Sequence, residues 1–277
     1  MVRELIDRFA YRYRLWSIES RSDNVGAGTK STLLDRDPQP SSTDEIAAVL
    51  KARTDVASRL IGGRGIEVGA GARPFPLPDS AQVLYGDIRE QASLQHYFQT
   101  TEVTLGSRID AQTYAEVEND SLDFVISAHV IEHLRDPIGS IVSAMRILKP
   151  GGIHLLVVPD MRFTFDRDRP ETTVEHVLSD YLDGGVATCR AAYEEHLRYV
   201  HPFLTGENHP EAEIQRQAAE GEKRWTEFDI HFHAWTRGGF EALLAAAQQI
   251  APFSIEAAVS VSNENIFGLK KTVSWQA

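Results

Sequence analysis

The chain of 277 residues contains a single cysteine, Cys189, and no long apolar run. One thiol cannot form an intrachain disulfide, which is typical of proteins in a reducing cytosol. No stretch approaches the roughly 18 consecutive apolar residues of a transmembrane helix. The first residues lack the apolar core of a secretion signal. The sequence therefore predicts a cytoplasmic protein that does not bind membranes.

Basic residues are outnumbered by acidic ones. Lys and Arg total 28 and Asp and Glu total 40, which gives a net charge of −12. An acidic chain repels a phosphate backbone, so general nucleic-acid binding is disfavoured. Arginines and aromatic residues alternate near the start of the chain, but Leu5, Phe9, Tyr13 and Trp16 follow helical spacing. This spacing favours an amphipathic helix over a basic nucleic-acid patch.

The remaining composition is that of a globular α/β protein. Apolar residues make up 42% of the chain and charged residues 25%, and the length fits one large domain or one domain with an insertion. Short apolar runs alternate with helical patterns over residues 62–160 and again from residue 237. The nearly continuous apolar run at 153–158 is typical of a strand buried on both faces. This alternation predicts a parallel sheet covered by helices.

Residues 161–236 interrupt the alternation and are rich in histidine, charged and aromatic residues. Helical patterns occur near 173–183, 187–200 and 211–225. Because insertions at the carboxyl ends of parallel strands often bind substrate, we interpret this segment as a substrate cap. Before the sheet, the spacing of Ser42 and Glu45 predicts the start of a helix. The predicted units are a helical lead at 1–61, a cofactor-binding core at 62–160, the cap at 161–236 and the end of the core at 237–277.

A glycine loop, Glu67–Gly71, follows the first predicted strand. Glycines allow a tight turn and a close approach of backbone to ligand. Asp87 lies 20 residues after Glu67, at the end of the second predicted strand, where a carboxylate can accept hydrogen bonds from ribose hydroxyls. These features fit either a dinucleotide or an adenosylmethionine site. Pro74 replaces the third glycine of the dinucleotide pattern, and further prolines at 76 and 78 disfavour a helix start there.

The segment 123–160, DFVISAHVIEHLRDPIGSIVSAMRILKPGGIHLLVVPD, resembles the fourth-to-fifth-strand stretch of class I S-adenosylmethionine-dependent methyltransferases. In that family Glu-His-Leu follows strand four, and Arg-Ile-Leu-Lys-Pro-Gly-Gly leads into strand five. The resemblance covers about residues 62–160 and, more loosely, 237–273. It implies a Rossmann-like, seven-stranded sheet with S-adenosylmethionine as cofactor. A doubly wound fold that binds another ligand is the alternative.

The resemblance also implies how the cofactor would bind. The glycine loop would surround its methionine part, the acidic residue after strand two would hold its ribose, and residues after strands three and four would flank the adenine and the sulfonium. Arg73 stands where many members have a third glycine, and it would either pair with the cofactor carboxylate or lie on the surface. The implied cofactor-binding residues are Glu67, Gly69, Gly71, Asp87, Ile88, Asp110, Ala111, Ala128 and His129.

Methyl transfer to a hydroxyl needs a base or a metal to remove the proton. Glu132 and His133 follow strand four, and His129 lies one helical turn earlier on the same face. On a strand, His231 and His233 would point to one side, together with Asp229. We therefore predict His133 or His231 as the catalytic base. The predicted ligands of a divalent cation such as Mg²⁺ are Glu132, His133, His231 and His233.

The same segment partly resembles the small-RNA 2′-O-methyltransferases. Those enzymes carry two glutamates and a histidine here, plus a later histidine, around a metal that meets the substrate hydroxyls. Glu132 and His133 match, whereas His129 replaces the first glutamate and Leu134 replaces an adjacent histidine. Many metal-free methyltransferases also have Glu-His-Leu at this place. The motif therefore leaves both a metal site and a structural role open.

The cap contains further polar candidates. Residues 166–169 alternate Asp and Arg, which fits a self-paired structural loop or a clamp for hydroxyl-rich substrates. His176, Asp180 and His196 lie in predicted helices and are interpreted as solvent-facing or structural.

The sequences TFDRDRP at 164–170 and HFHAW at 231–235 are similar to a group of bacterial methyltransferase-like sequences from surface-polysaccharide gene neighbourhoods. We therefore predict O-methylation of a small hydroxylated acceptor such as a sugar or glycoside. A metal-independent N- or aromatic O-methyltransferase and a non-catalytic cofactor-binding scaffold are the alternatives. The N-terminal helices would pack on their own domain or form a homodimer.

Overall fold

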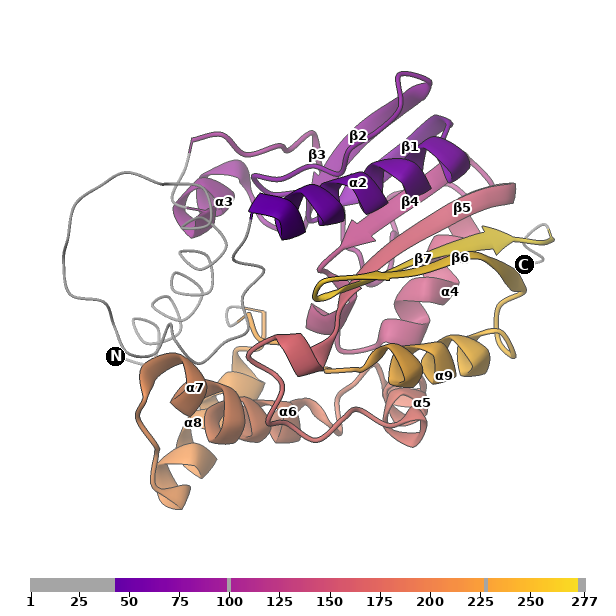
Figure 1. Cartoon of the computed structure of the whole chain (residues 1–277). Coiled ribbons are helices and arrows are strands. Elements are labelled where there is room, and N and C mark those ends of the chain that lie inside the picture. The colour runs from indigo at the N-terminus through magenta and orange to yellow at the C-terminus, as the bar shows by residue number, and fades with distance from the viewer. Residues whose placement is uncertain (1–42, 99–100, 227–228, 274–277) are drawn as a thin grey trace.

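A seven-stranded sheet forms the centre of the molecule, with the strand order β3-β2-β1-β4-β5-β7-β6 (Figure 1). The computed structural model describes residues 43–98, 101–226 and 229–273, so the predictions for the Leu5–Trp16 helix and for the Ser42 cap lie outside the described residues. Strands β1 to β5 are parallel, and β7 is antiparallel to both of its neighbours. This topology confirms the predicted Rossmann-like sheet. The strands are β1 (Gly63–Val68), β2 (Ala81–Asp87), β3 (Ser107–Arg108), β4 (Leu122–Ala128), β5 (Leu148–Pro159), β6 (Phe253–Val261) and β7 (Glu264–Lys271).

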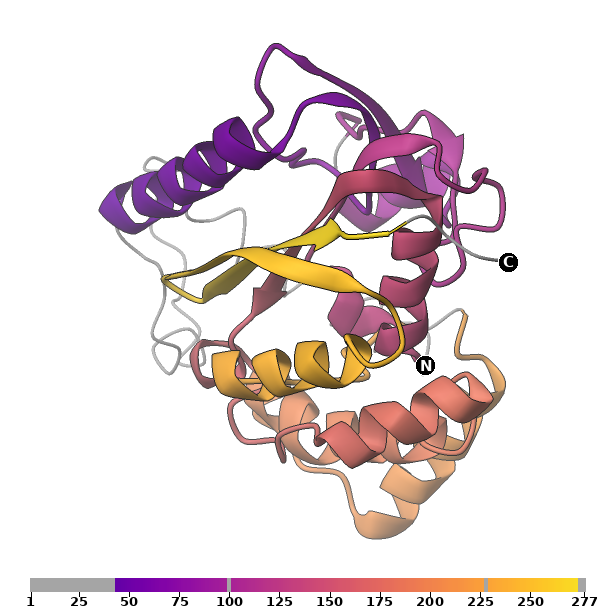
Figure 2. The ribbon, with the colours of Figure 1, turned by 90° about the vertical axis from the view of Figure 1, so that its right-hand side faces the viewer.

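Helices cover both faces of this sheet (Figures 1 and 2). Leu155 and Val157 of β5 pack in one apolar cluster with Ala57 of the helix before the sheet. Leu156 and Val158 pack in the other cluster, with residues of the helices on the opposite face. Both sides of β5 are therefore buried, which explains its continuous apolar sequence. The helices that accompany the sheet are α2 (Thr43–Leu60), α3 (Gln91–Phe98), α4 (Pro137–Ile147) and α9 (Arg237–Ala247).

The connection between β1 and β2 contains no helix over residues 69–80, all of which the structure describes. The prolines at 74, 76 and 78 lie in this segment, as expected for residues that cannot donate the backbone hydrogen bonds of a helix. Phe75 is buried within the segment and packs in the same apolar cluster as α2. The loop thus lies against the sheet on the face that α2 covers.

The cap (residues 161–236) is the helical region between β5 and α9, and it gathers at one end of the sheet (Figure 1). It has an apolar core of its own, which includes Cys189, Tyr193 and Ile214. Asp160 and Trp235 form a parallel bridge at its base. None of the described helices has the length and apolar character needed to cross a membrane. The cap comprises η3 (Met161–Phe163), α5 (Val174–Asp183), α6 (Cys189–Glu195), η4 (His196–Val200), α7 (His201–Thr205) and α8 (Glu211–Lys223).

Candidate active site

The glycine loop leaves the carboxyl end of β1 in a conformation that suits only glycine. Gly69 has φ +70° and Gly71 has φ +54°, a region that residues with a Cβ rarely adopt. A Cβ on Gly69 would lie 2.5 Å from Val130 Cγ2. Both carboxylate oxygens of buried Glu67 accept the Phe75 N–H, at 2.9 and 3.1 Å. Glu67 therefore holds the loop, and its predicted contact with the cofactor stays a prediction.

Acidic residues follow the next two strands at the same edge of the sheet. Asp87 ends β2, is buried, and accepts the Arg89 N–H at 2.8 Å. Asp110 follows β3 and accepts the Gln112 N–H at 2.9 Å. Because carboxyl ends of parallel strands share one edge, these carboxylates lie where the sequence places the ribose and adenine. Ala111 is buried, whereas Ile88 and Arg73 are exposed.

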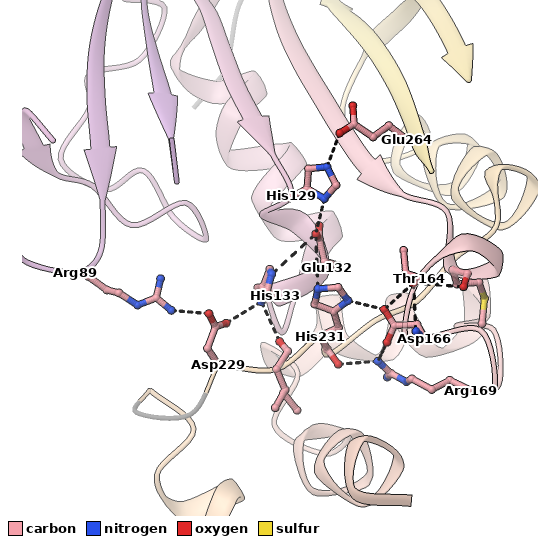
Figure 3. A network of polar contacts seen from close by, with 12 residues as sticks. Arg89, His129, Glu132, His133, Thr164, Asp166, Arg169, Asp229, His231 and Glu264 are labelled. Carbon is pink, nitrogen blue, oxygen red and sulfur yellow. Dashed lines mark hydrogen bonds and ion pairs between the residues drawn. The ribbon is translucent and has the colours of Figure 1, made fainter. Parts of the chain in front are cut away.

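One carboxylate and three imidazoles gather at the carboxyl end of β4 (Figure 3). We call this group the Glu132 cluster; His129, Glu132 and His133 follow β4 in the chain, and His231 comes from the end of the cap. Glu132 Oε1 lies 3.8 Å from His129 Nδ1, 3.9 Å from His133 Nε2 and 4.0 Å from His231 Nε2. Glu132 is 1% exposed, and neither of its carboxylate oxygens accepts a hydrogen bond from the described residues. The side chains at 129, 132 and 133 meet as predicted, but not on an α-helix. His129 has φ +54° and precedes a single 3-10 turn, η2 (Ile131–His133).

The second ring nitrogen of each histidine faces another carboxylate (Figure 3). Such pairing fixes the orientation of an imidazole and is typical of metal-binding histidines. Sequence spacing does not reveal Asp166 and Glu264 as partners of the histidines, because they lie 65 and 135 residues from the rings that they contact. The pairs are His133 Nδ1–Asp229 Oδ1 at 2.7 Å, His231 Nδ1–Asp166 Oδ2 at 2.6 Å and His129 Nε2–Glu264 Oε1 at 2.9 Å.

His233 lies outside this cluster. The prediction that His231 and His233 are ligands of the same cation is therefore wrong. Residues 229–234 form no strand. The N–H groups of Phe232 and His233 both donate to the Glu132 carbonyl, at 2.8 and 3.2 Å, whereas consecutive N–H groups of a strand point to opposite sides. His233 instead stacks on Trp235, with 5.2 Å between ring centroids. Asp229 likewise contacts His133 and Arg89 in place of the predicted face shared with His231.

Sequence comparison relates part of the chain to a known family. Residues 65–156 match the family model described as a methyltransferase domain, and they include the glycine loop, Asp87 and β4 with its histidines. Residues 65–156 of this chain form a methyltransferase domain. The seven-stranded sheet is the one that the resemblance implied. No curated protein matches the chain.

Solved structures similar to this methyltransferase include one from Thermotoga maritima, described as a SAM-dependent methyltransferase and possible histamine N-methyltransferase. It is 14% identical with a TM-score of 0.49, and the match covers 97% of this chain and 99% of that one. A SAM-dependent methyltransferase from Methanosarcina mazei is 15% identical with a TM-score of 0.42, over 79% and 98% of the two chains. One from Aquifex aeolicus is 13% identical with a TM-score of 0.41, over 88% and 98%.

The carboxylates around His133 disfavour its predicted role as the catalytic base. Burial opposes protonation of His133, but Asp229 and Glu132 outweigh it and raise the pKa of the ring to about 9. A ring that is already protonated at neutral pH cannot accept the proton of a substrate. Although burial opposes it, His231 and Arg169 lower the pKa of Asp166 to about 2. Asp166 is therefore a carboxylate that orients and polarises His231.

Burial raises the pKa of Glu67 to about 7 from its ordinary value near 4.5, against the opposing effects of the Phe75 N–H and Arg53. The folded state thus favours neutral Glu67, and this stabilisation is complete below pH 4.5 and is lost as the pH rises through 7. Glu67→Gln stays neutral at every pH. As the pH rises from acid to mildly alkaline, we expect its free energy of unfolding to increase relative to that of the wild type by on the order of 3 kcal/mol. Urea unfolding at both pH values measures this. Exposed Glu118→Gln is the control, and a pH-independent difference for Glu67→Gln would contradict the expectation.

Proposed function

We propose that this methyltransferase methylates a hydroxyl group of a small acceptor such as a sugar or glycoside, with a divalent transition cation at the Glu132 cluster. The observation that carries the proposal is the buried Glu132 carboxylate. Neither of its oxygens accepts a hydrogen bond from the described residues, and three imidazole nitrogens face Oε1 at 3.8 to 4.0 Å. An ionised carboxylate without such bonds is costly to bury. A cation shared with the imidazoles offsets that cost.

The cofactor assignment is supported by the backbone and charge of the sheet edge. Gly69 and Gly71 turn the backbone at positive φ, and glycines without side chains allow a ligand to come close to the backbone. Buried Asp87 ends the neighbouring strand and can accept hydrogen bonds from ribose hydroxyls. S-adenosylmethionine supplies the methyl group on a sulfonium. The chain contributes binding, orientation and the exclusion of water around the transfer.

The donor set indicates the class of cation. One ligand atom each from Glu132, His133 and His231 lie within 4.8 Å of one another. Imidazole ligands suit Mn²⁺, Co²⁺ or Zn²⁺ better than Mg²⁺, which prefers oxygen. A bound cation of this kind lowers the pKa of a coordinated hydroxyl. Asp166 and Asp229 orient the rings through their second nitrogens.

The choice of a small hydroxylated acceptor has separate support. The net charge of −12 disfavours a nucleic-acid substrate. The cap delivers Asp229 and His231 to the Glu132 cluster, so the acceptor meets cap residues at the reaction centre. The sugar class follows from the resemblance of segments 164–170 and 231–235 to sequences from surface-polysaccharide gene neighbourhoods.

The test is methyl transfer to a panel of sugars and glycosides. The release of S-adenosylhomocysteine measures the reaction. We expect EDTA to abolish transfer and Mn²⁺ or Co²⁺ to restore it. Glu132→Gln keeps the size of the side chain and removes its charge, and it should lower the metal-dependent rate at least about tenfold. Its affinity for S-adenosylhomocysteine, measured by calorimetry, should stay near the wild-type value. Exposed Glu116→Gln is the matched control.

Two outcomes would contradict the proposal in different ways. Transfer to an amine or phenol that is insensitive to EDTA and to Glu132→Gln would identify the metal-independent alternative. Tight cofactor binding without turnover of any acceptor would identify a scaffold.

A further inference from the structure

A second group of ligand-type side chains lies within the cap; we call it the Asp180 cluster (His176, Asp180 and His233). His176 and Asp180 are one turn apart on α5, so they share one face of that helix. His233 comes from the far end of the cap, just before α9. Asp180 Oδ2 lies 3.2 Å from His176 Nε2 and 3.6 Å from His233 Nε2. One ligand atom from each of the three residues lies within 4.8 Å of the others.

The two inner members of this cluster are buried with unsatisfied polar atoms. Asp180 is 0% exposed and His233 is 1% exposed. Asp180 Oδ2 and His233 Nε2 form no hydrogen bond with the described residues. Buried polar atoms normally have partners, because their desolvation is otherwise uncompensated. Of the two sequence-based interpretations of Asp180, its burial excludes the solvent-facing one and leaves the structural one. The unsatisfied atoms of the cluster still need a physical explanation.

The surrounding charge is suited to a cation. The Asp136, Asp180 and Asp183 carboxylates lie close enough to interact electrostatically. Carboxylates from the cap and from the start of α4 thus gather around Asp180.

Two of the three ligand separations are close to those of a zinc site. Zn²⁺ binds histidine nitrogen and carboxylate oxygen at about 2.0 to 2.1 Å, and the ligands of a tetrahedral site are then about 3.3 Å apart. The two measured separations, 3.2 and 3.6 Å, are close to that value. Thr188 Oγ1 donates to the other oxygen of Asp180 at 2.5 Å, and so orients the carboxylate. His176 has 28% of its side chain exposed, which gives an ion a path from solvent.

We propose that His176, Asp180 and His233 bind a divalent cation of the zinc class, at a site separate from the Glu132 cluster. Two imidazoles and one carboxylate leave a fourth position for water. The ion joins α5, near the start of the cap, to the segment at its end. Because His231 is two residues from His233, this link positions the segment that delivers His231 to the active site. The site therefore stabilises the cap and takes no part in the methyl transfer.

The experiment uses the full chain in the Glu132→Gln background, which weakens the Glu132 cluster as a competing metal site. After removal of metal with EDTA, the protein is titrated with Co²⁺ and then with Zn²⁺. We expect one equivalent of Co²⁺ to give visible d–d absorption, Zn²⁺ to displace it, and Zn²⁺ to raise the melting temperature. Adding His176→Gln should weaken Zn²⁺ binding at least about 100-fold and remove the rise in melting temperature. Adding Glu175→Gln, the exposed neighbour on α5, should change neither.

Zn²⁺ affinity that is unchanged by His176→Gln, or no binding of Co²⁺ or Zn²⁺ in the Glu132→Gln background, would overturn the proposal. Asp180→Asn is the second variant, because it keeps the size of the side chain and an oxygen for the Thr188 hydroxyl. It should lose Zn²⁺ binding with an unchanged circular dichroism spectrum. Both readouts are independent of methyl transfer, so they also distinguish failure of this site from failure of the Glu132 site.

Discussion

Replacing Asp87 with alanine is expected to lower the affinity for S-adenosylmethionine and S-adenosylhomocysteine at least about 100-fold. The carboxylate ends β2, is 7% exposed, and lies at the edge where the cofactor ribose is predicted. A hydrogen bond to a charged group contributes about 1.5 to 3 kcal/mol, and a ribose offers two donors. Loss of both corresponds to a factor of 100 or more in affinity. Isothermal titration with each ligand measures the effect.

Two further variants separate ribose binding from loop structure. Asp87→Asn keeps an acceptor for the Arg89 N–H, which the wild-type carboxylate binds at 2.8 Å, and removes the charge. We expect it to bind with an affinity between those of the wild type and Asp87→Ala. Asp79→Ala, at an exposed position before β2, should bind as the wild type does. Unchanged affinity of Asp87→Ala would refute the placement of the cofactor at this edge.

The largest loss of stability is expected for Arg169→Met. The guanidinium is 1% exposed and pairs with the equally buried Asp166 carboxylate at 2.9 Å. It also donates to the His231 and Phe232 carbonyls, at 2.8 and 3.2 Å. Removal of one partner of a buried ion pair leaves an uncompensated charge, which costs about 3 to 5 kcal/mol. Urea denaturation, followed by circular dichroism, measures this free energy of unfolding.

Arg190→Met is the control for this stability measurement. Arg190 is exposed and pairs with Glu194 at 3.2 Å on the surface of α6, so its loss should cost no more than about 1 kcal/mol. A similarly small loss for Arg169→Met would show that the Asp166–Arg169 pair does not hold the cap together. That result would reject the structural interpretation of the alternating Asp and Arg residues at 166–169.

The parts of this protein that could be predicted from sequence are those encoded by neighbouring residues. The apolar run of β5 and the glycine loop are local patterns, and the structure places both at the expected points of the sheet. Glu132 and His133 follow β4 directly, so their position at its carboxyl end follows from chain order alone. The prolines at 74, 76 and 78 likewise identified a helix-free connection.

The pairing of the histidines with carboxylates could not be predicted, because it depends on how the cap folds back. His231 contacts Asp166, 65 residues earlier, and no periodicity relates the two positions. Residues 229–233 were expected to form a strand. Instead the backbone turns around the Glu132 carbonyl, and His231 and His233 therefore lie in different clusters. Local alternation of residues is informative only where the backbone is extended. The choice between a solvent-facing and a structural Asp180 stayed open for a related reason, since a helix in a cap can be covered on more than one side.

The bridge between Asp160 and Trp235 has an evolutionary consequence. The chain leaves the core and returns to it at one point, where the Met161 N–H donates to the Trp235 carbonyl at 2.9 Å. A different cap could therefore be inserted between these two positions without a change in the strand order of the sheet. Such an exchange would also remove His231 and Asp229, which belong to the cap but face Glu132 and His133. Under the proposed function, an exchanged cap would change the acceptor contacts and the cap's part of the Glu132 cluster together, whereas the glycine loop and Asp87 would stay with the sheet.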